Sequence, residues 1–145
     1  MANDALKISI IIISYNVKDF LEHCLESVNR SLKGVPSEII VVDNNSIDGS
    51  VQMLKKRFPK IDLIESKENL GFSGGNNLAI NKAKGEYLVL LNPDTIVQED
   101  TFKTLLAFFD KTADASAATC KILNPDGTFS IDCRHSIPTP SIAFW

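Results

Sequence analysis

Polar residues cluster directly after four apolar runs of the sequence, and their side chains could bind a phosphorylated nucleotide. Carboxylate, amide and hydroxyl groups can exchange hydrogen bonds with a base, a ribose or a phosphate. Loops that only had to be soluble would not require such a concentration after every run. The clusters are Ser14-Tyr15-Asn16, Asp43–Asp48, Asn69–Asn77 and Asn92–Thr95.

Asp43 is the first candidate binding residue, because it ends the apolar run EIIVVD. A carboxylate at the end of a strand can accept hydrogen bonds from a uracil or thymine N–H group, or from ribose hydroxyls. The alternative is an Asx-turn or a cap on the next helix, which are common roles for aspartate. Asp48 fits the capping role better than Asp43 does.

Asp94 is the sharpest candidate, since it follows an apolar run and a proline, Pro93, that rigidifies the turn. Mg²⁺ and Mn²⁺ take oxygen ligands, often one or two carboxylates together with phosphate oxygens of a substrate. Asp94, with Asn92 beside it, could therefore hold a divalent cation that bridges a diphosphate. The alternative is a turn aspartate that caps the following helix.

Three glycines, Gly71, Gly74 and Gly75, lie just before a predicted helix or in its first turn. Glycine lets the backbone approach a ligand closely, and a helix N-terminus offers unpaired N–H groups to an anion. The spacing is not that of a dinucleotide-binding GxGxxG motif, and no Walker lysine follows. An ordinary structural turn is the alternative for this segment.

Short apolar runs alternate with amphipathic stretches, which predicts an α/β fold with a mostly parallel sheet and helices on both faces. Ligands of such sheets bind in the crevice at the carboxyl ends of the strands, where the polar clusters lie. The first, second and fourth strands are predicted to be buried, and two further strands, Ala117–Leu123 and Thr128–Cys133, flank a turn at Asn124–Gly127. The alternating elements are strands at Lys7–Ser14, Glu38–Asp43, Ile61–Glu65 and Glu86–Leu91, and helices at Val17–Leu32, Ser50–Phe58, Ser73–Lys84 and Glu99–Lys111.

The composition is that of one globular domain, residues 1–145, with a formal net charge of -3. A negative balance argues against a nucleic-acid partner, which would need a basic surface. The three cysteines, Cys24, Cys120 and Cys133, form neither a disulfide framework nor a zinc motif. The apolar run Ile8–Ile13 is too short for a signal peptide or a membrane span, so we expect a cytoplasmic protein.

Four segments, in order and spacing as well as in content, resemble the inverting family 2 glycosyltransferases with the GT-A fold, particularly their rhamnosyltransferase-like branch. The resemblance runs from about Lys7 to at least Asp126 and implies a Rossmann-like sheet that binds a nucleotide sugar. The matching segments are SIIIISYN (Ser9–Asn16), EIIVVDNNSIDGS (Glu38–Ser50), ENLGFSGGNNLAI (Glu68–Ile80) and GEYLVLLNPDT (Gly85–Thr95).

The resemblance implies a role for each candidate position. Ser14 and Tyr15 match a pair that lies against the base and ribose, and Asp43 matches the aspartate that binds the nucleobase. Asn92 and Asp94 match the metal-binding D-x-D motif in its N-x-D form, which carries one carboxylate rather than two. The other residues expected to line the nucleotide sugar are Asn16, Asn45, Asn69, Gly71, Gly74, Gly75 and Asn76.

The activity that the resemblance implies is transfer of a sugar from a UDP, dTDP or GDP sugar to an acceptor hydroxyl, with inversion. A divalent cation, Mg²⁺ or Mn²⁺, would stabilise the leaving diphosphate, and a carboxylate base would deprotonate the acceptor. We expect a glycan or lipid-linked acceptor in cell-surface polysaccharide synthesis, with the full-length protein at the inner face of the membrane. The base is not assigned among its candidates, which are Glu99, Asp100, Asp110, Asp114, Asp126 and Asp132.

The apolar end of the sequence, Ile142–Trp145, suggests that the chain was continuing into more structure. We therefore expect the nucleotide-sugar-binding part of a truncated GT-A domain, without its acceptor-binding half and inactive alone. The alternative is a module that binds the nucleotide sugar and transfers nothing. A nucleotidyltransferase would need a Gly-rich loop with a basic residue after the first strand, where Ser14-Tyr15-Asn16 stands instead.

Overall fold

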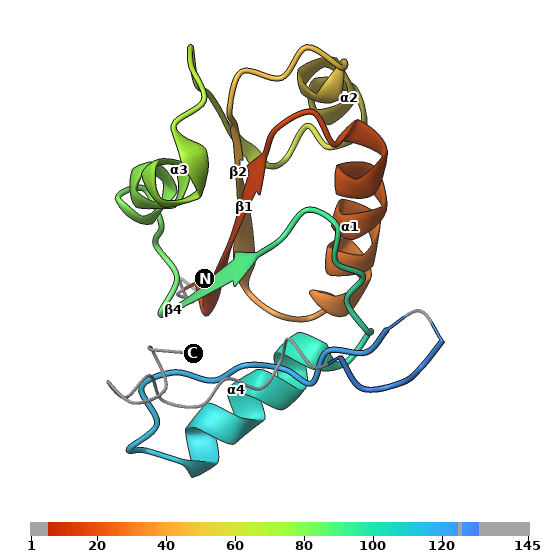
Figure 1. Cartoon of the computed structure of the whole chain (residues 1–145). Coiled ribbons are helices and arrows are strands. Elements are labelled where there is room, and N and C mark those ends of the chain that lie inside the picture. The colour runs from red at the N-terminus through yellow and green to blue at the C-terminus, as the bar shows by residue number, and fades with distance from the viewer. Residues whose placement is uncertain (1–5, 125, 131–145) are drawn as a thin grey trace, which may run out of the picture. The chain divides into compact units, whose positions relative to one another are not determined.

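The computed structural model describes residues 6–124 and 126–130 of the 145-residue chain. Strands and helices alternate along the chain, as Figure 1 shows, which confirms the predicted α/β class. None of the helices in these two ranges is long and apolar enough to cross a lipid bilayer. In chain order the elements are β1 (Ile8–Ser14), α1 (Lys18–Ser31), β2 (Ser37–Asp43), α2 (Ser50–Arg57), β3 (Asp62–Glu65), α3 (Gly71–Ile80), β4 (Tyr87–Leu91) and α4 (Thr101–Lys111).

The four strands form one parallel sheet in the order β3-β2-β1-β4. The chain moves outward from β1 to β3 and then returns to the other side of β1, so the strand order reverses at β1. Ser14 at the end of β1 lies opposite Asp43 at the end of β2. Because the strands are parallel, the polar clusters that follow them lie together at the carboxyl ends of the strands, where sheets of this kind bind ligands.

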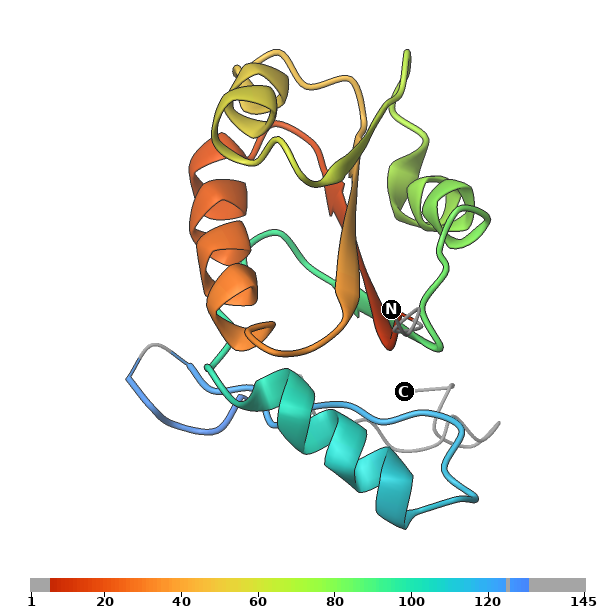
Figure 2. The ribbon, with the colours of Figure 1, turned by 180° about the vertical axis from the view of Figure 1, so that it is seen from behind.

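Helices cover both faces of the sheet, as predicted. In both views, α1 and α2 lie on one face and α3 lies on the other (Figures 1 and 2). Alternate residues of β1 divide between two cores, since Ile10 and Ile12 pack with α1 and α2 while Ile11 packs with Ala79 of α3. Burial on both faces explains why β1 is a continuous apolar run rather than an alternating one.

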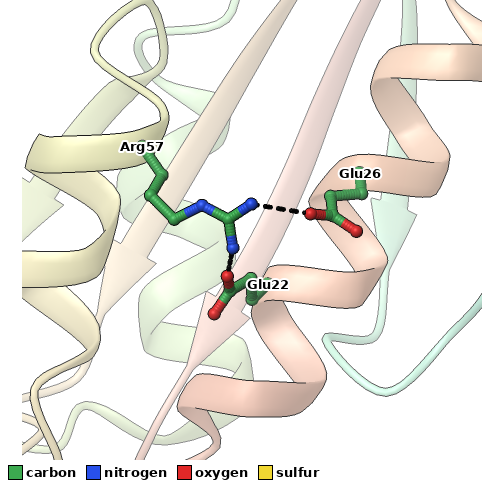
Figure 3. A network of polar contacts seen from close by, with 3 residues as sticks. All are labelled: Glu22, Glu26 and Arg57. Carbon is green, nitrogen blue, oxygen red and sulfur yellow. Dashed lines mark hydrogen bonds and ion pairs between the residues drawn. The ribbon is translucent and has the colours of Figure 1, made fainter.

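The surfaces of α1 and α2 are joined by an ion-pair network (Figure 3). The Arg57 guanidinium in α2 pairs with the Glu22 carboxylate and, at 2.8 Å, with the Glu26 carboxylate of α1. Glu22 and Glu26 are four residues apart, so they lie on the same face of α1. The side chain of Arg57 is 47% exposed, and we expect such a pair of contacts to stabilise the helix packing only slightly.

The prediction of a buried fourth strand is wrong for one of its faces. Leu88 and Leu90 of β4 are 46% and 51% exposed, whereas Val89 and Leu91 pack against the core formed by α1 and α2. Among the described residues β4 pairs only with β1 and therefore forms an edge of the sheet. The apolar run YLVLL predicts a strand, but it does not show which of its faces a helix covers.

The helix predicted over Ser73–Lys84 is shifted toward the N-terminus, because α3 begins at Gly71 and ends at Ile80. The backbone N–H of Gly71 donates to Asn69 Oδ1 at 2.9 Å, which pairs one of the N–H groups that a helix start leaves free. At the other end, the Lys84 N–H donates to the Glu38 carboxylate of β2 at 2.6 Å. Lys84 therefore belongs to the connection into β4 and not to the helix.

Of the described residues, those up to Leu106 form one compact unit, and those from Ala107 to residue 130 belong to a second. The two strands predicted in the second unit are wrong as far as residue 130, since one isolated bridge joins Leu123 to Phe129. The turn is confirmed, because the Gly127 N–H donates to the Asn124 carbonyl at 2.9 Å. A two-stranded hairpin on its own is only marginally stable in water, so turn residues of this kind do not by themselves produce two regular strands. Residues 131–133 of the second predicted strand lie outside the described residues.

Candidate functional site

Buried polar atoms without a protein partner gather at the carboxyl ends of β1 and β2. Ser14, Asp43 and Asn44 are 0%, 2% and 2% exposed, and Ser14 and Asp43 are partners in the strand register. Ser14 Oγ, Asp43 Oδ1 and Asn44 Oδ1 have no hydrogen-bond partner among the described residues. Buried polar atoms are almost always hydrogen-bonded in folded proteins. Three unpaired atoms on adjacent strand ends therefore indicate a place where a polar ligand completes the structure.

The two carboxylate oxygens of Asp43 have different surroundings. Oδ2 accepts a hydrogen bond from the Ser46 backbone N–H at 2.9 Å, which is the contact of an Asx-turn. Oδ1 is one of the unpaired atoms. The turn and the ligand-binding interpretations of Asp43 thus apply to different oxygens, and Asp43 does not cap α2, whose N-cap residue is Gly49.

Asn44 belongs to this group, although sequence reasoning did not select it. Its Nδ2 donates to the Gly71 carbonyl at 3.2 Å, which links the end of β2 to the start of α3, while its Oδ1 is unpaired. The feature of the sequence that could have identified Asn44 as a site residue is its position directly after Asp43. Its neighbour Asn45, which was selected, is exposed and has a φ of 66°, so it shapes the turn and stands in solvent.

Asn16 ties the loop after β1 to the loop after β2. Its backbone N–H donates to Ser46 Oγ at 3.0 Å, and its Oδ1 accepts from the Ile47 N–H at 2.9 Å. Its φ of 53° is one that asparagine tolerates better than most residues. Tyr15, directly before it, is 48% exposed and stands at the rim of the site.

Asp48 caps helices, as the sequence predicts. Its Oδ2 accepts from the N–H of Lys18 at 2.8 Å, and its Oδ1 accepts from the N–H and the hydroxyl of Ser50 at 3.0 and 2.6 Å. Partial burial raises the pKa of the Asp48 carboxyl, but the hydrogen bonds from Ser50 and Lys18 outweigh it and lower the pKa below its usual value. Asp48 therefore anchors the loops around the site and is not left to bind a ligand.

The glycine-rich segment packs α3 closely against the sheet. A Cβ atom on Gly75 would lie 3.0 Å from Ile13 Cγ2 of β1, whereas one on Gly74 would lie 2.9 Å from Leu70 Cβ, in the N-cap residue of α3 itself. Asn76 is 4% exposed, and its Nδ2 donates to the Phe72 carbonyl at 2.8 Å within the same helix. These contacts account for Gly74, Gly75 and Asn76 through packing, while Gly71 and Asn69 lie at the helix start beside Asn44.

Asp94 lies in an exposed turn after β4, and the turn is attached to α1. The Cys24 thiol donates to the Asn92 carbonyl at 3.7 Å, and the Val97 N–H donates to Ser27 Oγ at 3.0 Å. Burial is the main reason that the pKa of the Cys24 thiol is raised to about 12; the Thr95 N–H opposes this shift and the negative charge of Asp94 adds to it. The alternative of a helix cap is excluded, since α4 begins only at Thr101.

Asp94 can supply one carboxylate to a cation that a diphosphate brings with it. No group of three or more His, Cys, Asp or Glu residues that could hold a metal ion occurs in residues 6–124 and 126–130. Mg²⁺ is commonly held by one or two carboxylates together with phosphate oxygens and water, so a single exposed carboxylate fits a shared site but not an all-protein cage. Asn92 is exposed beside it.

The candidate bases remain unassigned. Glu99 and Asp100 are exposed residues just before α4, and Asp110 and Asp114 are exposed within or after it. Asp126 accepts hydrogen bonds from the N–H and the hydroxyl of Thr128, which hold its pKa below its usual value. Asp132 lies outside the described residues.

Comparison with known proteins places this architecture in a family. The family model described as Glycosyl transferase family 2 matches residues 9–140. Poly(ribitol-phosphate) beta-glucosyltransferase of Bacillus spizizenii is 39% identical over 97 residues, which cover 63% of this chain and 15% of that protein. The chain spans between 12% and 15% of the length of three such curated relatives.

Two solved structures share the fold. TarS of Staphylococcus aureus in complex with UDP superposes with a TM-score of 0.67 at 27% identity, over 74% of this chain and 33% of that chain. A mannosyltransferase of Pyrobaculum calidifontis in complex with GDP-Man and Mn²⁺ superposes with a TM-score of 0.65 at 21% identity, over 86% of this chain and 37% of that one. The parallel sheet with helices on both faces is thus the GT-A arrangement that the sequence predicts.

Proposed function

The chain belongs to glycosyl transferase family 2, and on that basis we propose that the site at the carboxyl ends of β1 and β2 binds a nucleoside diphosphate sugar. The sugar would be transferred to an acceptor hydroxyl with inversion at the anomeric carbon. Because this chain spans a small share of its relatives, we propose it as the nucleotide-sugar-binding part of such an enzyme. We propose cell-surface polysaccharide synthesis as the setting, and the name of one relative, a poly(ribitol-phosphate) glucosyltransferase, supports a polymeric acceptor.

The unpaired atoms of Ser14, Asp43 and Asn44 are the observation that carries this proposal. Asp43 Oδ1 can accept the imide N–H of a uracil or thymine base, because an ionised carboxylate only accepts hydrogen bonds. Ser14 Oγ can donate to a base carbonyl and accept from a ribose hydroxyl, and Asn44 Oδ1 can accept from a hydroxyl. A base and ribose seated at this edge would satisfy all three atoms.

UDP is the ligand we propose first, with dTDP and GDP as the alternatives. The support is that TarS, which shares 27% of its residues with this chain in the aligned part, is solved in complex with UDP. The imide N–H that Asp43 would bind is shared by uracil and thymine and also has a counterpart in guanine, so Asp43 alone does not choose among them. The narrower likeness to rhamnosyltransferases and the location at the inner face of the membrane stay predictions.

We propose that Asp94, with Asn92 beside it, faces the diphosphate and shares a divalent cation with it. A carboxylate and a diphosphate repel each other, so the geometry favours nucleotide binding only when a cation lies between them. Bound there, Mg²⁺ or Mn²⁺ would act as a Lewis acid that stabilises the leaving diphosphate. Exposure of the Asp94 side chain and the Mn²⁺ named in the mannosyltransferase structure support this role.

The proposed binding step can be separated from transfer. Nothing among the described carboxylates is assigned as the base that would deprotonate the acceptor, so we expect the 145-residue chain to bind UDP and to transfer no sugar. Incubation with UDP-sugars and polymeric acceptors, followed by mass spectrometry, measures this directly. Product formation by the chain alone would show that a base lies within residues 1–145.

The test of the binding proposal is titration calorimetry with UDP in Mn²⁺. Asp43→Asn keeps one oxygen for the Ser46 N–H but places an NH₂ donor where a second acceptor stood. We expect UDP affinity to fall by roughly 1.5–3 kcal/mol, the range for a hydrogen bond to a charged group. The matched control is Asp62→Asn, an exposed residue at the start of β3 that pairs with Ile40 and not with Asp43. Equal affinities for both variants would contradict the assignment.

A further inference from the structure

Two buried polar residues of α1 hold both ends of the turn that carries Asp94. Cys24 and Ser27 are both 0% exposed and lie three residues apart, so they share one face of the helix. Their partners, Asn92 and Val97, lie 68 and 70 residues later in the sequence. In Figure 1 the segment after β4 runs beside α1, as these contacts require.

The Ser27 hydroxyl donates one hydrogen bond and accepts another. Its proton goes to the Cys24 carbonyl at 2.7 Å in the preceding turn of α1. Its oxygen is then left to accept the N–H of Val97 at 3.0 Å. The Val97 side chain is 7% exposed and belongs to the core formed by α1 and α2, so its N–H is in a place where water would not replace Ser27.

The Cys24 thiol holds the other end of the turn. It donates to the Asn92 carbonyl, which also accepts the Thr95 N–H at 3.2 Å and so closes the turn around Asp94. Asp94 thus lies between Asn92 and Val97, the two residues through which the turn is bonded to α1.

Cys24 and Ser27 lie in the apolar core formed by α1 and α2. Leu21, Leu25 and Val28 surround them on the same side of α1 and are all fully buried. A serine in such a place costs free energy unless its hydroxyl is hydrogen-bonded. Ser31, one turn further along α1, is also 0% exposed but its Oγ has no partner among the described residues.

We propose that Cys24 and Ser27 are positioning residues that hold the Asn92–Val97 turn so that Asp94 presents its carboxylate to the cation of a bound nucleoside diphosphate. The inference rests on the proposed function of Asp94 and adds residues that do not touch the ligand. The metal dependence of nucleotide binding would then depend on buried residues of α1 as well as on the exposed turn.

The experiment compares Ser27→Ala with the matched control Ser31→Ala in the full chain. Calorimetric titration with UDP, once in Mn²⁺ and once in chelator, gives the factor by which Mn²⁺ enhances UDP affinity. We expect Ser27→Ala to lower that factor by roughly tenfold. Misplacement of a positioned group by about 1 Å can cost about a hundredfold, and here the Cys24 contact still holds the other end of the turn. Affinity in chelator should not change, and Ser31→Ala should keep the enhancement of the parent chain.

Cys24→Ala is the second variant, in case Ser27→Ala does not fold. It removes the thiol but leaves the Asn92 carbonyl bonded to the Thr95 N–H, so no buried atom loses its only partner. We expect a smaller fall in the Mn²⁺ enhancement than for Ser27→Ala. In both variants hydrogen exchange of the amides in residues 92–97 should become faster than in the parent chain, because the turn loses an attachment.

The outcomes separate this inference from the proposed function. Unchanged Mn²⁺ enhancement and unchanged exchange in both variants would overturn the positioning role alone. An equal fall in Ser31→Ala would also overturn it, because the effect would then come from loss of core packing. A parent chain whose UDP affinity does not respond to Mn²⁺ would overturn the proposed role of Asp94 and, with it, the metal role assigned here.

Discussion

Replacement of Asp48 by alanine tests whether one side chain holds the starts of two helices. α1 begins at Lys18 and α2 begins at Ser50, and their own N-cap residues, Val17 and Gly49, make no side-chain cap hydrogen bond. Asp48 supplies acceptors to both, with Oδ2 on the Lys18 N–H and Oδ1 on Ser50. Asp48→Ala therefore leaves two helix starts uncapped with a single substitution.

The expected loss follows from these contacts. Loss of one N-cap side chain costs about 1 kcal/mol, so two caps suggest roughly 2 kcal/mol in the free energy of unfolding at pH 7. Asp48 is mostly exposed, and solvent screening of its charge places the value nearer to about 1–1.5 kcal/mol. This remains larger than the effect of an ordinary surface substitution, which stays within about 0.5 kcal/mol.

The loss should depend on pH in a direction set by the lowered pKa of Asp48. A carboxyl whose pKa is lower in the folded state than in the unfolded chain stabilises the fold above its unfolded pKa, near 3.9. That stabilisation disappears as the pH falls through the lower, folded-state value. The difference between the parent chain and Asp48→Ala should therefore be full at pH 7 and shrink below about pH 4.

Urea unfolding at pH 7 and at pH 3 measures both quantities. Asp110→Ala, an exposed aspartate of α4 without a capping contact in the structure, is the control for removal of a surface charge. Asp48→Ala and Asp110→Ala with equal free energies of unfolding at pH 7 would refute the double cap. A difference that persists undiminished at pH 3 would refute the role of the ionised carboxylate.

Three further predictions concern other parts of the chain. Asp94→Asn should remove most of the Mn²⁺ enhancement of UDP affinity, measured by calorimetry with and without chelator. It should leave thermal unfolding unchanged because the side chain is exposed. A normal response of UDP affinity to Mn²⁺ would contradict the metal role of Asp94. Gly85→Ala should cost about 3 kcal/mol in urea unfolding, since its Cβ would lie 2.5 Å from the backbone nitrogen of Ser9. The control Gly34→Ala, with a φ of +77° and open space around it, should cost only about 1 kcal/mol, and equal losses would show that crowding is not the cause. Arg57→Ala should cost less than about 1 kcal/mol at low salt and still less in 1 M salt, because exposed ion pairs are weak and screened; a larger loss that salt does not reduce would point to packing of the Arg57 side chain.

The order of elements and the edge that carries the site follow from the sequence. β1 is a continuous apolar run because both of its faces are buried, and that pattern requires helices on both sides of a parallel sheet. Once the strands are parallel, residues that follow them share one edge, so Asp43 and Asp94 had to lie at the same end of the sheet. The turn at Asn124–Gly127 was equally readable, because its residues satisfy one another locally.

Tertiary structure alone decided which atoms at that edge are available. The free oxygen of Asp43 is identified only once Ser46 is seen to occupy the other, and Asn44 enters the site because Gly71 fixes its amide. The attachment of the Asp94 turn to α1 and the exposed face of β4 also lie beyond local patterns. Periodicity reports how a residue relates to neighbours three or four positions away. The contacts of Asn44 with Gly71 and of Ser27 with Val97 join residues 27 and 70 positions apart, and only the packed chain brings them together.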